Sequence, residues 1–251
     1  MNLTDQSILL TGGSRGIGRA MLDQLLDRGC RVMAVARDVS DLEGHEAARD
    51  GRLIPLAADL AEPGAAEHIA DRVWARLPDV SVLINNAAVM TYTRYPGTGD
   101  DHADAIAREI AINLTAPLQL SVAMLPILAS RPRAAICNVT SGLAHAPIAN
   151  AAVYCATKAG LAQFSRVLRY QCEDAGLGIE VSEAVMTLVD TTLSMGDPAR
   201  KARPEAAAAE VLVGIEAGRP QIWVERTRLL RRIMRLSPAL GFRVMRRMTP
   251  A

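Results

Sequence analysis

Tyr154 and Lys158 are the two residues whose types and spacing point most directly to chemistry. Side chains four residues apart on a helix share one face, so the phenol and the ammonium group would lie side by side. A free tyrosine titrates at about pH 10, and a cation beside it lowers that pKa. The pair could then donate and accept a proton near neutral pH. Two ordinary surface neighbours have the same spacing, so the interpretation depends on the residues around them.

A glycine-rich segment near the N-terminus predicts a nucleotide site. Residues 11–18, Thr-Gly-Gly-Ser-Arg-Gly-Ile-Gly, follow an apolar run and precede an amphipathic pattern, so strand, turn and helix come in that order. Gly12, Gly16 and Gly18 would let the backbone approach a pyrophosphate, and N–H groups at the helix start would bind its charge. The spacing differs from the GxGxxG fingerprint, and an ordinary glycine-rich turn is the alternative.

Further polar residues follow in a characteristic order. Asn86 comes directly after the apolar run 80–85, Asn113 lies in an expected helix, and Ser141 ends the run 134–141. Together with the glycine turn, Tyr154 and Lys158, this order resembles the short-chain dehydrogenase/reductase family over about residues 10–224. Residues 109–114, 141–144 and 188–191 resemble the branch named after the bacterial DltE oxidoreductases, a name from which no role in teichoic-acid chemistry is transferred.

The resemblance implies hydride transfer between a nicotinamide cofactor and a carbonyl or alcohol substrate, as in a carbonyl reductase or an alcohol dehydrogenase. Tyr154 would transfer the proton, and Lys158 would lower its pKa and hold the nicotinamide ribose. Ser141 would hydrogen-bond the substrate oxygen, and Asn113 would anchor a water molecule that relays protons. A redox-neutral epimerase or dehydratase with a retained cofactor, and a non-catalytic dinucleotide-binding sensor, are the alternatives.

Charge at the end of the second predicted strand favours NADP(H) over NAD(H). Arg37 stands where a carboxylate would bind the adenosine ribose and repel a 2′-phosphate, and Arg15 could close on the same phosphate. Solvated arginines are the alternative, because 26 of the 28 basic residues are arginine. Asp59 and Leu60 resemble the adenine contact of the family. The expected cofactor-binding residues are Gly12, Ser14, Arg15, Gly16, Ile17, Gly18, Arg37, Asp59, Leu60, Asn86, Ala87, Ala88, Tyr154, Lys158, Val189 and Thr191.

Two long loops, 90–101 and 186–204, are expected to border the substrate, and the family places a lid in the second. The expected substrate contacts are Met90, Tyr92, Leu143 and His145, although a loop histidine is more often simply solvated. They are mainly apolar, which suits a hydrophobic carbonyl compound. Met186 and Thr187 replace a proline pair or Pro-Gly of the family, which predicts altered specificity rather than lost chemistry.

Seven apolar runs of strand length must position these residues. They alternate with amphipathic segments, which predicts an α/β fold: a single Rossmann-like domain with a parallel seven-stranded sheet and helices on both faces. The runs are 7–11, 31–36, 52–58, 80–85, 134–141, 179–185 and 221–224. With 251 residues, half of them apolar, the chain suits one catalytic domain, 1–225, followed by a basic extension, 226–251.

The net charge of +1 gives no reason to expect a nucleic-acid partner. Four scattered cysteines and four histidines without ligand spacing predict no metal site. No secretory signal or uninterrupted apolar span is recognised, so a cytoplasmic location is expected.

The charge is unevenly distributed along the chain. Residues 1–225 carry a balance of −7, whereas residues 226–251 hold eight arginines and no acid. The basic extension could dock on another subunit, fold back on the acidic body, or contact an anionic membrane surface. By resemblance, the protein is expected to be a homodimer or homotetramer, with contacts through the helix of Tyr154 and Lys158 and the helix 204–217.

Overall fold

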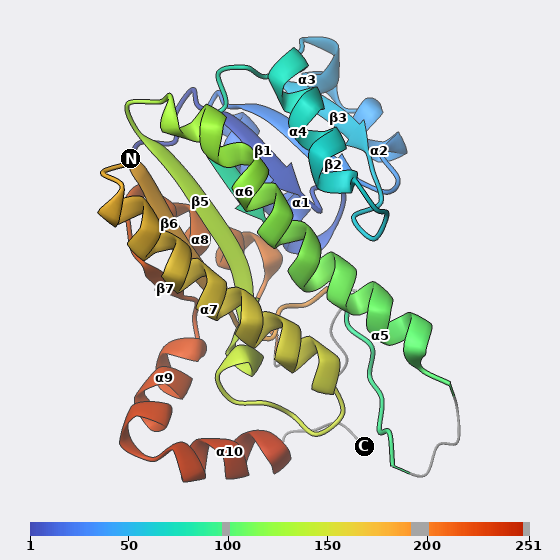
Figure 1. Ribbon diagram of the computed structural model, residues 1–251, viewed down its shortest axis with the longest axis vertical. Helices are drawn as coiled ribbons and strands as arrows, with labels where there is room; N and C mark the ends of the chain where they lie inside the picture. Colours follow the sequence, from blue (N-terminus) through green and yellow to red (C-terminus); the bar gives the residue numbers. More distant parts are fainter. Residues whose placement is uncertain (97–100, 192–200, 248–251) are drawn as a thin grey trace.

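A seven-stranded parallel sheet forms the centre of the protein, for which the computed structural model describes residues 1–96, 101–191 and 201–247. Its order is β3-β2-β1-β4-β5-β6-β7. The predicted α/β, Rossmann-like fold is confirmed (Figure 1). The strands are β1 (Ser7–Thr11), β2 (Arg31–Ala36), β3 (Leu53–Ala57), β4 (Val82–Asn85), β5 (Ala134–Ser141), β6 (Ile179–Met186) and β7 (Gln221–Trp223).

Helices cover both faces of the sheet (Figure 1). On one face lie α1 (Gly16–Asp27) and α8 (Pro204–Glu216), which pack against each other. On the other face lie α4 (Ala65–Arg76), α6 (Ala116–Ala129) and α7 (Ala152–Asp174). Two short helices, α2 (Ser40–Glu43) and α3 (Glu46–Arg49), join β2 to β3.

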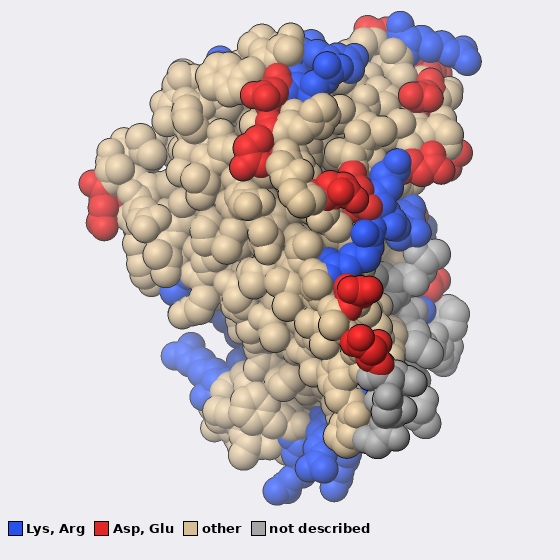
Figure 2. All heavy atoms as spheres, turned by 45° about the vertical axis from the view of Figure 1, so that its right-hand side comes forward, with Lys and Arg blue, Asp and Glu red and all other residues tan. Residues whose placement is uncertain are grey.

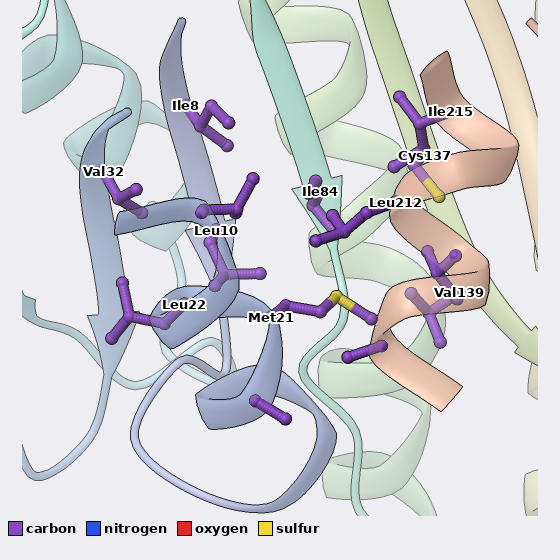
Figure 3. Close-up of a cluster of buried hydrophobic side chains, with 14 of the residues drawn as sticks. Ile8, Leu10, Met21, Leu22, Val32, Ile84, Cys137, Val139, Leu212 and Ile215 are labelled. Carbon is purple, nitrogen blue, oxygen red and sulfur yellow. The ribbon is translucent and has the colours of Figure 1, made fainter. Parts of the chain in front are cut away.

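Each central strand supplies side chains to both faces, because successive residues of a strand point in opposite directions. Ile8 and Leu10 of β1 pack with Met21 of α1 and Leu212 of α8 (Figure 3). Leu9, between them, belongs to the core on the other side, which α4 and α6 cover. Burial on both faces explains why the strands are recognisable as continuous apolar runs.

Four strands differ from the predicted bounds by one or two residues. β3 begins after Arg52, whose Nε donates to Asp50 Oδ2 at 2.9 Å in the preceding turn. β6 continues to Met186, because that residue pairs in register with Ser141 of β5. β4 lacks the first two predicted residues, and β7 lacks the last one. Such shifts are ordinary at strand ends, where pairing stops.

One continuous helical segment combines α5 (Ala103–Ile110), the π-helical turn η1 (Ala111–Thr115) and α6. Pro117 has no N–H to donate to the carbonyl of Asn113, and the wider turn occurs beside it. By length and composition Ala103–Ala129 would suffice to cross a membrane, with a mean hydropathy of 1.6 in a window that is 44% buried. The apolar composition of this segment has a structural reason, because side chains such as Met124 and Ile127 are buried in the core beneath α4.

The basic extension forms two further helices, α9 (Thr227–Leu236) and α10 (Pro238–Arg247), below the carboxyl ends of the strands in Figure 1. The predicted break at Pro238 is confirmed. Thr227 is buried, and its hydroxyl donates to the carbonyl of Val224 at 2.7 Å. Gly241 is buried so close to Met234 that a Cβ would overlap the methionine sulfur. The two helices therefore pack closely against each other.

Candidate active site

A cavity of about 1330 Å³ lies beyond the carboxyl ends of the strands. β1 and β4 are neighbours in the sheet although β2 and β3 separate them in the chain, so the connections diverge at this point. Ligands of open α/β sheets bind at such a switch point. A pocket for one small ligand usually has a volume of about 300–1000 Å³. The larger volume of this cavity leaves room for a dinucleotide and a substrate together.

The glycine turn forms one wall of the cavity and fits a pyrophosphate. Gly12 and Gly16 have φ angles of 71° and 56°, in the left-handed region that favours glycine. A Cβ on Gly12 would lie 2.8 Å from the Cα of Ala87, and one on Gly18 would overlap the carbonyl oxygen of Gly12. Only glycine keeps the backbone this close, and α1 begins at Gly16 with its N–H groups at the cavity.

Asn86 fastens the glycine turn to the end of β4. Its Nδ2 donates to the carbonyls of Thr11 and Gly12, at 3.1 and 3.2 Å. The hydroxyl of Thr11 accepts from the backbone N–H groups of Asn86 and Ala87 in return. Asn85, in contrast, is buried and bonds to Asn138 and Ser121 inside the core. Asn86 rather than Asn85 therefore borders the cavity.

Arg15 and Arg37 are exposed at the end of the cavity formed by the glycine turn and β2. Within the described residues, neither forms an ion pair. Asp38, the carboxylate nearest in sequence, accepts from the N–H and hydroxyl of Ser40 at 3.0 and 2.7 Å. These bonds lower the pKa of Asp38 and hold its carboxylate in the turn. The two guanidinium groups remain available to an anion.

All sixteen expected cofactor-binding residues line this one cavity. Asp59 also accepts a hydrogen bond from Arg108 at 2.7 Å, which fixes its carboxylate beside Leu60. Thr191 lies over the glycine turn, where its Cγ2 would be 3.0 Å from a Cβ on Gly16. Met186 and Thr187, which replace the proline turn of the family, line the cavity as well.

Ser141 and Tyr154 meet at the opposite end of the cavity. Ser141 ends β5, and its Oγ accepts from the N–H of Leu143 at 3.1 Å, which caps the short turn η2 (Gly142–Ala144). Burial raises the pKa of Tyr154, and a hydrogen bond between the Ser141 and Tyr154 hydroxyls acts in the opposite direction. The phenol is therefore protonated at neutral pH.

Lys158 lies one turn further along α7 and is 2% exposed. Its Nζ donates to the carbonyl of Val139 at 2.8 Å and lies 5.7 Å from the centre of the Tyr154 ring. Burial lowers the pKa of Lys158 to about 8. Removal of water from the buried phenol outweighs the hydrogen bond from Ser141, so the pKa of Tyr154 is raised in this structure. The expected lowering of that pKa by Lys158 stays a prediction.

Asn113 lies behind this site, not on the cavity wall. Its Oδ1 accepts from the N–H of Val89 at 2.9 Å, and its Nδ2 donates to the carbonyl of Val89 at 2.7 Å. Both bonds hold the segment after β4, which carries Ala88 and Met90 into the cavity. Asn113 thus positions the cavity wall, and its expected role with a water molecule stays a prediction.

Glu109 is an ionisable residue near the site that the sequence analysis did not single out. It is buried one turn before Asn113, and its Oε2 accepts from the N–H of Thr91 at 3.2 Å. Oε1 has no hydrogen-bond partner among the described residues. Burial raises the pKa of Glu109, while the charge of Lys158 acts to lower it. The four-residue spacing to Asn113 was the available signal.

Three of the four expected substrate contacts, Met90, Tyr92 and Leu143, line the cavity. His145 does not, so the cavity gives no support to this expectation. Its Nε2 lies 3.1 Å from Oε1 of the buried Glu183, and the centre of its ring lies 4.8 Å from that of Trp223, with the ring planes tilted by 40°. Burial acts to raise the pKa of Glu183, but hydrogen bonds from His145 and Gln221 prevail and lower it. A buried carboxylate requires such partners, which explains where His145 points.

The C-terminal helices contribute a wall that the sequence analysis missed. Five apolar side chains of α9 and α10 face the end that holds Tyr154, namely Leu229, Leu230, Ile233, Val244 and Met245. Leu230 packs on η2, where its Cδ2 would lie 3.1 Å from a Cβ on Gly142. The i, i+3 and i+4 spacing of positions 229, 230 and 233 was the available signal. Among the described residues there is no cluster of metal-binding side chains.

Comparison with known proteins identifies the family. A family model described as short chain dehydrogenase matches residues 6–202. The "Uncharacterized oxidoreductase DltE" of Bacillus subtilis (strain 168) is 35% identical over 239 residues, 92% of each chain. Benzil reductase ((S)-benzoin forming) of the same strain is 29% identical over 186 residues, 74% of this chain and 75% of the relative. A short chain dehydrogenase from Burkholderia cenocepacia J2315, solved with NADP, covers 100% of both chains with 26% identity and a TM-score of 0.83.

The protein therefore belongs to the short-chain dehydrogenase/reductase family of NAD(P)-dependent oxidoreductases. The glycine turn, the cavity size and the arginines at one end fit a dinucleotide.

Proposed function

We propose that the protein is an NADP(H)-dependent reductase of an apolar carbonyl compound, or the corresponding alcohol dehydrogenase. The observation that carries this proposal is one cavity with Arg15 and Arg37 at one end and the bonded hydroxyls of Ser141 and Tyr154 at the other. When bound, the nicotinamide supplies the hydride for reduction or takes it up in oxidation. The chain supplies the binding groups and the proton.

In the reductive direction Tyr154 donates its proton to the substrate oxygen, and Ser141 donates a hydrogen bond to the same oxygen. Burial keeps the phenol protonated at neutral pH, which is the form that can donate. Lys158, with a pKa of about 8, is near enough to neutrality to exchange a proton with the site after each turnover.

Preference for NADP(H) is supported by the two guanidinium groups and by the engagement of Asp38 with Ser40. A guanidinium group binds phosphate through two parallel hydrogen bonds. The relative solved with NADP is consistent with this choice.

The test is a screen of hydrophobic ketones and aldehydes with NADPH and with NADH, followed by absorbance at the nicotinamide band. We expect NADPH to be consumed in equimolar amount to the alcohol formed, with NADH less effective at equal concentration. Turnover of a substrate without net consumption of NADPH would instead establish a redox-neutral reaction and refute the proposal. Binding of NADPH without turnover of any carbonyl compound would favour a sensor.

A further inference from the structure

The C-terminal helices carry cations that the rest of the protein does not neutralise. Arg228 binds Glu210 at 2.7 Å, and Arg231 lies 5.6 Å from the centre of the Trp223 ring. Five other arginines of α9 and α10 are exposed and form no ion pair within the described part of the chain: Arg232, Arg235, Arg243, Arg246 and Arg247. In Figure 2 basic side chains occupy this lower end of the molecule, and no acidic side chain lies among them on the face shown.

Large apolar side chains are exposed between these arginines. Leu236 is 86% exposed, Leu240 48% and Phe242 47%. None of the three lines the cavity. The contact between Gly241 and Met234 holds the two helices together without them. The fold therefore gives these side chains no partner in the described structure, although exposing them to water is unfavourable.

Two further side chains connect this surface to the active site. Leu229 and Val244 line the cavity and are also 60% and 38% exposed. Both α9 and α10 therefore contribute an accessible apolar side chain to the cavity wall. An apolar molecule that arrives at the outer surface of the helices would reach the end of the cavity that holds Tyr154 along an apolar path.

We propose that α9 and α10 dock on an anionic lipid bilayer and that the carbonyl substrate enters the cavity from that bilayer. The second part rests on the proposed function, whereas the first does not. Leu236, Leu240 and Phe242 would enter the boundary of the acyl chains, while the neighbouring arginines extend to the phosphate groups. The substrate class is a carbonyl compound that partitions into lipid.

The alternation of charge and apolar surface favours lipid over a protein partner. Five exposed arginines surround Leu236, Leu240 and Phe242, and α9 and α10 contain no acidic residue. This composition is typical of amphipathic helices that lie in an anionic membrane interface. A bilayer surface accepts both kinds of side chain, because phosphate groups and acyl chains lie within a few ångströms of each other. An acidic protein would bind the arginines but would leave the apolar side chains in water.

The test is flotation of the full chain, with NADPH bound, on vesicles of phosphatidylcholine with and without phosphatidylglycerol. We expect binding only to the anionic vesicles, with release as salt increases. The double variant Leu236→Ser/Phe242→Ser should bind at least about tenfold more weakly, since two apolar side chains no longer enter the lipid. Arg232→Gln should weaken binding about fivefold, the equivalent of about 1 kcal/mol per basic residue.

Two controls keep the result specific. Trp74→Ser and Arg72→Gln change exposed side chains on α4, far from α9 and α10 in Figure 1, and should bind vesicles like the unchanged protein. All variants should reduce a water-soluble ketone at the original rate, because none of these residues lines the cavity. Turnover of a long-chain ketone carried in the vesicles should fall at least about tenfold for Leu236→Ser/Phe242→Ser and about fivefold for Arg232→Gln, and it should not fall for the two control variants.

Absence of binding to anionic vesicles would overturn the docking proposal, even if the water-soluble ketone is reduced. Equal binding of all variants would overturn it as well. A lower oligomeric mass of the double variant, without vesicle binding by the unchanged protein, would assign the surface to a second copy of the chain. Vesicle binding without reduction of any ketone would contradict the proposed function and leave docking supported.

Discussion

Replacing Lys158 with methionine should stabilise the cofactor-free protein while it removes activity. The pKa of this lysine falls from 10.5 to about 8 because the ammonium group is buried. About 1.4 kcal/mol corresponds to each pKa unit, so burial of the charge costs about 3 kcal/mol at neutral pH. The variant also leaves the carbonyl of Val139 without its donor, and this loss destabilises the folded protein by about 1 kcal/mol. A net gain of about 2 kcal/mol raises Tm by about 4–8 °C in a chain of this size.

The stability advantage of Lys158→Met should depend on pH in a definite direction. Below pH 8 the lysine is protonated in both the folded and the unfolded protein, so the penalty is fully present. Between about pH 8 and 10.5 the folded protein loses this proton first, and the penalty is progressively relieved. The advantage of Lys158→Met should thus be largest near pH 7 and shrink towards pH 10.

Scanning fluorimetry without cofactor at pH 7 and pH 10 measures this difference. Arg166→Met is a matched control, because it removes an exposed cation from the same helix and should leave Tm within the small range of surface changes. A variant of Lys158 that melts at or below the temperature of the unchanged protein at pH 7 would refute the reasoning. An advantage that is equal at both pH values would refute it too.

Three other predictions address the cofactor and the assembly. Arg37→Asp should weaken NADPH binding at least about tenfold and leave NADH binding nearly unchanged, because it removes a charged hydrogen bond to the 2′-phosphate. Calorimetry measures both affinities, with Arg49→Asp as the control. An unaltered ratio of the NADPH and NADH affinities would place the phosphate elsewhere. Gly18→Ala should lower both NADPH affinity and Tm, since its Cβ overlaps the carbonyl of Gly12, whereas Gly44→Ala, whose Cβ meets nothing nearer than 3.9 Å, should change neither. Light scattering at micromolar concentration should give the mass of a dimer or tetramer. Val167→Asp, on the exposed face of α7, should dissociate this oligomer. A monomeric mass of the unchanged protein would contradict the expectation.

The sheet and the cofactor end of the cavity could be predicted from the sequence because both depend on local pattern. Parallel strands covered on both faces are continuous apolar runs, and three of the seven had the predicted bounds. The carboxyl ends of such strands lie along one edge of the sheet, so residues at or just after these ends, such as Ser141 and Arg37, can be expected to line one cavity.

What the sequence did not reveal depends on contacts between distant segments. The position of His145 follows from Glu183, a carboxylate 38 residues away that burial forces to find partners. The apolar side chains of α9 lie at the cavity in a helix whose first residue, Thr227, is hydrogen-bonded to the carbonyls of Val185 and Val224. Likewise, the pKa of Lys158 and Tyr154 is set by burial, which a spacing of four residues cannot predict.

The central claim is that Tyr154 transfers the proton in a redox reaction with NADPH. Tyr154→Phe keeps the ring and the packing and removes only the hydroxyl group, so NADPH affinity by calorimetry should remain within about twofold of the unchanged protein. Turnover of the best ketone from the screen should fall about 100- to 10,000-fold, the usual contribution of general acid catalysis. Normal NADPH binding with turnover within threefold of the unchanged protein would contradict the claim.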